Sequence, residues 1–169
     1  MKTKRQKELI DSFLLTLDTE TGALYREIVV YLSELGYNPK KERAHISFKH
    51  DLHNKQIAKI GIKSKNSSPF FALRFSACQD YSQKLAEAVR AAIIKSPSKT
   101  PGCVHKNCDY CAGDPETHIY TFPFPDKETK AHCGAYALEI PGIVAEDLVE
   151  IKQLIKKEHD YLLKYELDT

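Results

Sequence analysis

The chain has 169 residues, of which 42% are hydrophobic and 28% charged, and this length and composition predict a globular protein with one ordinary core. The sequence contains no run of about 18 apolar residues, so it predicts no membrane span. The net charge is +2, but residues 1–100 carry 18 Lys and Arg against 10 Asp and Glu, whereas residues 101–169 carry 7 against 13. A half that faces a polyanion would produce this asymmetry, although differently solvated segments explain it more simply.

The N-terminal segment is basic and then apolar, as in an export signal. However, Glu8, Asp11 and Ser12 interrupt the apolar part, and no small-residue cleavage site follows. An amphipathic helix from Thr3 to Leu17 fits the pattern better. The lack of an export signal predicts a cytoplasmic protein, in which the five cysteines stay reduced.

A second helix is predicted from Gly22 to Leu35, with Gly36 as a left-handed cap and Asn38-Pro39 as the end of the helical pattern. Three segments of alternating polarity then predict an antiparallel β-meander: RAHISFKHDL, QIAKIGIKS and PFFALRFSA. The outer face of this meander would carry basic and polar side chains, namely His45, Lys49, Lys59, Lys63 and Arg74.

A third helix, from Asp80 to Lys95, is followed by SPSKTPG, the most linker-like stretch of the sequence. We therefore divide the chain into a part with helices and meander, residues 1–96, and a part with a cysteine loop, a hairpin and a C-terminal helix, residues 97–169. The two parts are expected to form one unit. Residues 118–140 predict two strands around a turn at PDKET, and residues 141–166 predict a long closing helix. The predicted fold class is α+β: an antiparallel β-meander packed with helices, plus a zinc-stapled β-hairpin and a long C-terminal helix.

Four of the five cysteines lie within 31 residues, as Cys103-x4-Cys108-x2-Cys111 and then Cys133, whereas Cys78 stands alone in an apolar segment. Two cysteines separated by two residues on a tight turn present both sulfurs to one side, at the separation that tetrahedral zinc requires. With PDKET as the turn, Cys133 would lie roughly opposite Tyr120 and close to the loop. The pattern therefore predicts a four-cysteine zinc site formed by Cys103, Cys108, Cys111 and Cys133.

Other interpretations of the cysteines remain open. His118 or His132 would serve as a substitute for Cys133 or would orient a ligand from behind it, and His105 is a further candidate within the loop. The C-x4-C-x2-C spacing also occurs in iron–sulfur proteins, but the loop lacks the small residues that wrap a cluster closely. A thiol redox pair is disfavoured because no helix follows the C-x-x-C pair. Independent, unreactive thiols are the plainest alternative.

Candidate chemistry outside the cysteine loop is sparse. There is no glycine-rich phosphate loop and no nucleophile motif. His50, His53 and His159 show no ligand spacing, and solvent exposure is the expectation for His50 and His53 at a strand end. Lys59, Lys63 and Arg74 are candidate anion-binding residues on the meander's outer face, although an ordinary solvated face explains them as well.

Several blocks, PFFALRFSA…YSQKLAEAVR, YTFPFPD, HCG and EIKQLIKKEHDYL, resemble those of a family of small bacterial Cys-loop proteins with a zinc-type arrangement of four cysteines, over about residues 45–165. The resemblance implies the architecture and no activity.

These observations predict a small metal-binding protein with a structural zinc ion. We expect a binding or regulatory module for a ligand or protein partner that the sequence does not identify, rather than an enzyme. Alternatives are a metal- or thiol-dependent enzyme that uses the loop from Cys103 to Cys111, and a binder of nucleic acid or another anion that uses the basic sheet face. Nucleic acid is possible as a partner but not favoured, and no membrane is expected.

Overall fold

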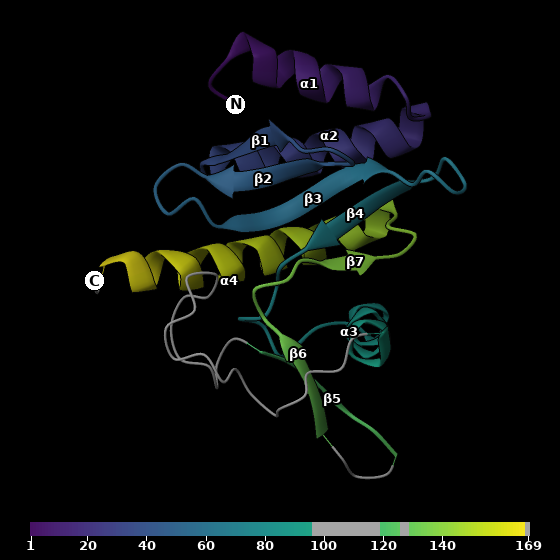
Figure 1. Cartoon of the computed structure of the whole chain (residues 1–169), viewed down its shortest axis with the longest axis vertical. Coiled ribbons are helices and arrows are strands. Elements are labelled where there is room, and N and C mark those ends of the chain that lie inside the picture. The colour runs from purple at the N-terminus through teal and green to yellow at the C-terminus, as the bar shows by residue number, and fades with distance from the viewer. Residues whose placement is uncertain (96–118, 126–128, 168–169) are drawn as a thin grey trace.

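The computed structural model describes residues 1–95, 119–125 and 129–167 and confirms an α+β fold. A five-stranded antiparallel sheet has the order β1 (Tyr37–Lys41), β2 (Ile46–His50), β3 (Gln56–Ile62), β4 (Pro69–Leu73) and β7 (Leu138–Ile140). Strands β5 (Ile119–Pro123) and β6 (Thr129–Cys133) form a separate hairpin. Figure 1 shows α2 (Thr19–Glu34) and α4 (Leu148–Leu167) behind the large sheet. Helix α1 (Lys4–Leu14) lies beyond the β1 edge, and α3 (Gln83–Lys95) and the hairpin lie below β7. No described helix covers the sheet face turned towards the viewer in Figure 1.

The helices begin where side chains satisfy their first N–H groups. Helix α1 (Lys4–Leu14) starts at a capping box, in which Thr3 accepts from the Gln6 N–H and the Gln6 side chain accepts from the Thr3 N–H. Helix α2 (Thr19–Glu34) starts three residues earlier than predicted, because the Asp18 carboxylate accepts from the Thr21 N–H at 2.9 Å. The other helices are α3 (Gln83–Lys95) and α4 (Leu148–Leu167), the latter preceded by a short 3-10 turn.

The predicted meander is confirmed as β2 (Ile46–His50), β3 (Gln56–Ile62) and β4 (Pro69–Leu73). Strand β1 (Tyr37–Lys41) is not predicted by the sequence pattern, since Pro39 indicates only the end of a helix. β1 pairs with β2 alone and forms one edge of the sheet. An edge strand tolerates a proline because one side of its backbone needs no ladder hydrogen bonds.

The sequence predicted one strand after the PDKET turn, but the structure has two strands there, β6 and β7. Strands β5 (Ile119–Pro123) and β6 (Thr129–Cys133) form the hairpin, and the chain then turns into β7 (Leu138–Ile140). β7 pairs with β4 rather than with the hairpin. The C-terminal part thus supplies an edge strand to the sheet built by the N-terminal part.

The core lies between the large sheet and the helices α2 and α4. Its fully buried side chains come from both layers and include Ile28, Leu32, Phe48, Phe71, Leu73 and Ile155. Helix α4 buries an apolar stripe that includes Ile151, Ile155 and Leu162. Val144 precedes this helix and is 48% exposed. None of the described helices is long and apolar enough to cross a membrane.

Candidate functional site

Cys133 is the last residue of β6, and it pairs with Ile119, the first residue of β5. The sequence placed Cys133 roughly opposite Tyr120, which is one residue from the observed partner. Cys133 is half-buried and lies at the open end of the hairpin, where the chain enters β5. The other predicted ligands and two of the alternatives lie outside the described residues: Cys103, Cys108, Cys111, His105 and His118.

His132 lies beside Cys133 in the chain but on the opposite face of β6, because successive strand side chains alternate. Its strand partner is the buried Tyr120, and its ring lies 5.4 Å from that of Tyr136. The side chains of His132 and Cys133 therefore lie on opposite faces of the hairpin. Within residues 1–95, 119–125 and 129–167, no three His, Cys, Asp or Glu side chains are placed to hold a metal ion.

Tyr120 fixes the hairpin to the rest of the protein. Its side chain is 1% exposed, and its hydroxyl accepts from the Phe75 N–H at 3.0 Å and donates to the Tyr136 carbonyl at 2.9 Å. Burial raises the pKa of the Tyr120 hydroxyl well above its usual range, so the group stays protonated. Tyr120 thus anchors the hairpin whose second strand carries His132 and Cys133.

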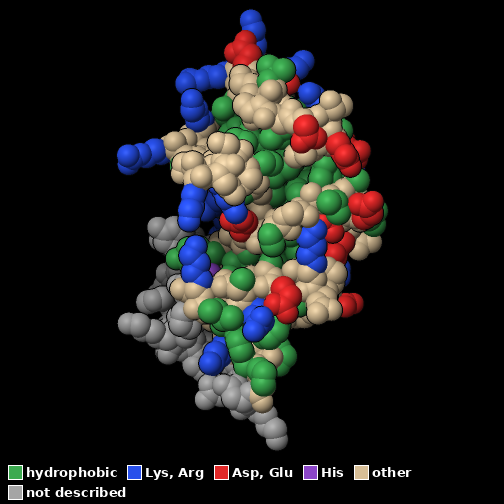
Figure 2. Space-filling model, turned by 90° about the vertical axis from the view of Figure 1, so that its right-hand side faces the viewer, with side chains coloured by type: hydrophobic (Ala, Val, Ile, Leu, Met, Phe, Trp, Pro, Cys, Tyr) green, Lys and Arg blue, Asp and Glu red, His purple; other side chains and the backbone are tan. Residues whose placement is uncertain are grey.

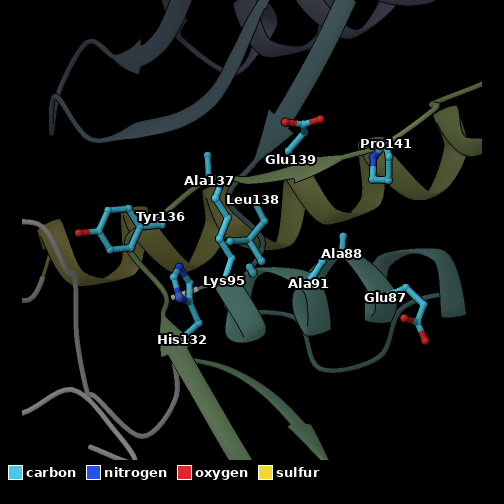
Figure 3. A pocket seen from close by; sticks show the side chains of 11 residues that line it. Glu87, Ala88, Ala91, Lys95, His132, Tyr136, Ala137, Leu138, Glu139 and Pro141 are labelled. Carbon is cyan, nitrogen blue, oxygen red and sulfur yellow. The ribbon is translucent and has the colours of Figure 1, made fainter. Parts of the chain in front are cut away.

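A groove of about 690 Å³ lies between α3 and the segment that runs from β6 through β7. Figure 3 shows His132 and Tyr136 at one end and Glu139 and Pro141 at the other. The helix contributes Ala88, Ala91 and Ala92 to its wall. Because alanine reaches only as far as Cβ, this helix face leaves space that longer side chains would fill.

Some of the charged side chains that line the groove form ion pairs with described residues and others do not. Glu139 forms an ion pair with Lys63, and Glu87 forms one with Arg90 at 3.2 Å. Lys95 also lines the groove and has no ion pair with any described residue. An apolar wall with one cation that no described residue neutralises suits a small molecule that has an apolar body and an anionic end.

The structure contradicts the placement of Arg74 on the outer face of the meander. β4 ends at Leu73, and the Arg74 side chain turns inward, where it is 1% exposed and its Nε lies 2.5 Å from Oε1 of Glu158. Burial raises the pKa of the Glu158 carboxyl, and the adjacent Arg74 opposes that shift. Arg74 thus belongs to the core. Lys59 and Lys63 remain on the outer face, with Lys63 paired to Glu139.

Sequence reasoning missed a histidine cluster, formed by His50, His53 and His159 around Tyr37. The rings of His50 and His53 stack with centroids 4.3 Å apart, and those of His50 and His159 lie 5.5 Å apart. His50 is only 7% exposed, so the expectation of solvent exposure is wrong for it. A signal was present in the sequence, because His50 continues the alternation of Ile46 and Phe48 and therefore falls on the core face.

The hydrogen bonds of this cluster argue against a role as metal ligands. The Nδ1 atoms of His50 and His53 accept from the backbone N–H groups of Leu52 and Lys55, at 3.2 and 3.1 Å. A neutral imidazole that accepts at Nδ1 carries its proton on Nε2, which then has no lone pair for a metal. The cluster is better suited to packing neutral rings than to holding a cation.

The histidine cluster predicts a loss of stability in mild acid. Burial first, and then the neighbouring His50, lower the pKa of His53 to about 4 and also lower that of His159. Between that value and the unfolded value of about 6.5, the unfolded chain binds more protons, so stability is full above about pH 6.5 and falls towards pH 4. The His53 ring is partly exposed, so we expect its contribution to be about 1–2 kcal/mol.

Urea unfolding at about pH 7 and pH 5 measures this effect. The matched variant is His53→Asn, because an asparagine side chain can also accept from a backbone N–H two residues on and does not titrate. We expect the variant to lose less stability between the two pH values than the native protein. An equal loss in both would show that His53 does not contribute.

Comparisons with known proteins find no matching protein family, no matching curated protein and no matching solved structure. The resemblance to small bacterial Cys-loop proteins therefore stays a prediction, and the residues and their geometry are the basis for a functional proposal.

Proposed function

We propose that the protein is a small zinc-binding module in which Cys103, Cys108, Cys111 and Cys133 hold one structural ion, and that its ligand site is the groove on the other side of the hairpin. The observation that carries the proposal is the alternation in β6. Cys133 points to one side of the hairpin, whereas His132 points to the groove. One short strand would thus connect the metal to the ligand site.

The sequence supplies the support for the metal. Three cysteines with C-x4-C-x2-C spacing precede the hairpin, and seven residues separate Cys111 from Ile119, the strand partner of Cys133. A chain of that length spans at most about 30 Å, and it is long enough to permit Cys111 and Cys133 to share one ion. The half-buried position of Cys133 also suits a ligand that is partly shielded from water.

A structural role follows from the donor set. Four thiolates complete a tetrahedral zinc site and leave no position for an activated water, so the proposal includes no catalysis at the metal. Ligands that are distant in the chain have no preformed site in the unfolded state, so binding free energy becomes folding free energy. The ion would fix the open end of the hairpin, and with it the wall of the groove that His132 provides.

Elemental analysis of protein purified under reducing conditions tests the proposal. We expect about one zinc ion per chain. Cys133→Ser should lose the metal and lower the melting temperature, whereas the matched control Cys78→Ser should keep the metal, since Cys78 lies apart, hydrogen-bonded to the Asp80 carbonyl. In NMR spectra, the ring signals of His132 should shift when a chelator removes the ion.

Other outcomes would contradict the proposal in distinguishable ways. Reduced native protein without zinc would exclude the metal site. A brown protein with visible absorbance would indicate an iron–sulfur cluster. If Cys133→Ser keeps the metal and His118→Ala loses it, the fourth ligand is His118.

A further inference from the structure

The open face of the large sheet, the one turned towards the viewer in Figure 1, has a defined set of residues. Directly paired residues share a face, so Lys40, Ser47, Lys59 and Ala72 form one row across four strands. Residues two positions along each strand lie on the same face. The open face therefore includes Asn38, Lys40, Ser47, Lys49, Gln56, Lys59, Gly61, Lys63, Phe70, Ala72 and Glu139.

The charge of the open face is positive, and the described residues neutralise little of it. Glu139 pairs with Lys63, and the Glu42 carboxylate beside the face accepts from the Ser47 hydroxyl at 3.2 Å. Lys40, Lys49 and Lys59 form no ion pair with any described residue. In Figure 2, Lys and Arg side chains gather along the left edge, the side that faces the viewer in Figure 1, and many Asp and Glu lie towards the other side. In this view, cationic side chains thus gather on the sheet side.

The middle of the open face consists of small residues and carries one aromatic ring. Ser47, Gly61 and Ala72 are buried beneath their longer neighbours. The Phe70 ring lies over Gly61, where an added Cβ would come within 2.7 Å of it, so the ring takes the place of a side chain there. Phe70 remains partly exposed. The face therefore presents a ring to solvent between lysines.

The spacing of the lysines suits a chain of negative charges. Neighbouring strands are about 4.8 Å apart, so the Cα atoms of Lys40 and Lys59, two strands apart, are separated by about 10 Å. Lys49 follows Ser47 by two residues, about 7 Å along β2. An extended polyanion would meet several ammonium groups at once.

We propose that the open face binds single-stranded nucleic acid, with phosphates at Lys40, Lys49 and Lys59 and a base stacked on Phe70. Proteins that bind single strands combine a cationic track with aromatic stacking platforms, and this face has both. A membrane partner fits less well, because none of the strongly exposed large hydrophobic side chains among the described residues lies on the open face. An acidic peptide would use the lysines but not the ring. The proposal is independent of the zinc ion, since every residue that carries it precedes the cysteine loop.

Fluorescence anisotropy with a labelled oligothymidylate, titrated with the full-length protein at several salt concentrations, tests the proposal. Three phosphate contacts predict that log K falls with log salt concentration with a slope of about −2. Lys49→Glu with Lys59→Glu should weaken binding at least about tenfold and flatten this slope. Phe70→Leu, which keeps Gly61 covered, should weaken binding about fivefold or more through lost stacking.

The matched control is Lys156→Glu with Lys164→Glu on α4, which changes the charge equally on the covered side of the sheet. This control should bind nearly as the native protein does, and the melting temperatures of all variants show whether they are folded. Three results would overturn the proposal: no salt-dependent binding; equal weakening by the face and control variants; or tighter binding of a DNA duplex, polyglutamate or phosphatidylserine vesicles than of the single strand.

Discussion

Replacing Glu158 with alanine is expected to lower the free energy of unfolding by about 3–5 kcal/mol. The Glu158 side chain is fully buried, and its carboxylate lies against the Arg74 guanidinium, which is itself 1% exposed. Without Glu158, the buried Arg74 guanidinium would lose the carboxylate that lies against it, while its own charge would stay in the core. Urea unfolding at neutral pH measures the difference.

The same carboxylate also fixes the chain that follows β4. It accepts from the Ala77 N–H at 2.8 Å and from the Ser76 hydroxyl at 3.3 Å, so Glu158 ties this segment to α4. Glu158→Gln keeps the shape and one acceptor oxygen but not the charge. We expect it to destabilise the protein less than Glu158→Ala does, because some of these hydrogen bonds persist.

A surface ion pair on the same helix provides the control. Lys156 pairs with Asp160 in solvent, and Lys156→Ala should cost at most about 1 kcal/mol. The double variant Arg74→Met with Glu158→Leu should recover much of the loss, because it removes both buried charges together. If Glu158→Ala costs no more than Lys156→Ala, the buried pair does not stabilise the fold.

The fold was predictable where local pattern and tertiary structure agree. Alternating polarity identified β2, β3 and β4, because each of these strands turns one face to the core. β1 was missed because Pro39 is a poor strand residue except at an edge, and being an edge is a property of the whole sheet. β7 was missed because its pairing with β4 joins segments far apart in the chain.

The site residues were predictable to a smaller extent. Arg74 followed the alternation of β4 in the sequence, but the strand ends one residue earlier and the side chain turns towards Glu158, which is 84 positions away. The histidine cluster likewise assembles His159 of α4 with residues of the meander. The register at Cys133 was predicted only approximately, to within one residue of the observed pair with Ile119, because local spacing does not fix the pairing of two strands. Contacts between distant segments are not encoded in local spacing.

Gly36→Ala is expected to lower the free energy of unfolding by about 2–4 kcal/mol, for two separable reasons. Gly36 has φ of +89°, a conformation that costs an L residue energy because its Cβ approaches the backbone. The added Cβ would also lie 2.9 Å from Nε2 of His50. That ring cannot retreat easily, since it stacks on His53 and its Nδ1 accepts from the Leu52 N–H.

Two further variants separate these reasons. Gly142→Ala is the control for backbone strain, because Gly142 has φ of +55° and no atom within 4 Å of an added Cβ, so it should cost only about 1–2 kcal/mol. In a double-mutant cycle, Gly36→Ala should cost less in a His50→Ala background than in the native protein, because the ring that it meets is gone. A coupling energy of zero would show that backbone strain alone accounts for the free-energy cost of Gly36→Ala. The expected coupling would instead show that the helix cap after α2 and the histidine cluster are packed against each other, which gives Gly36 a second role besides ending the helix.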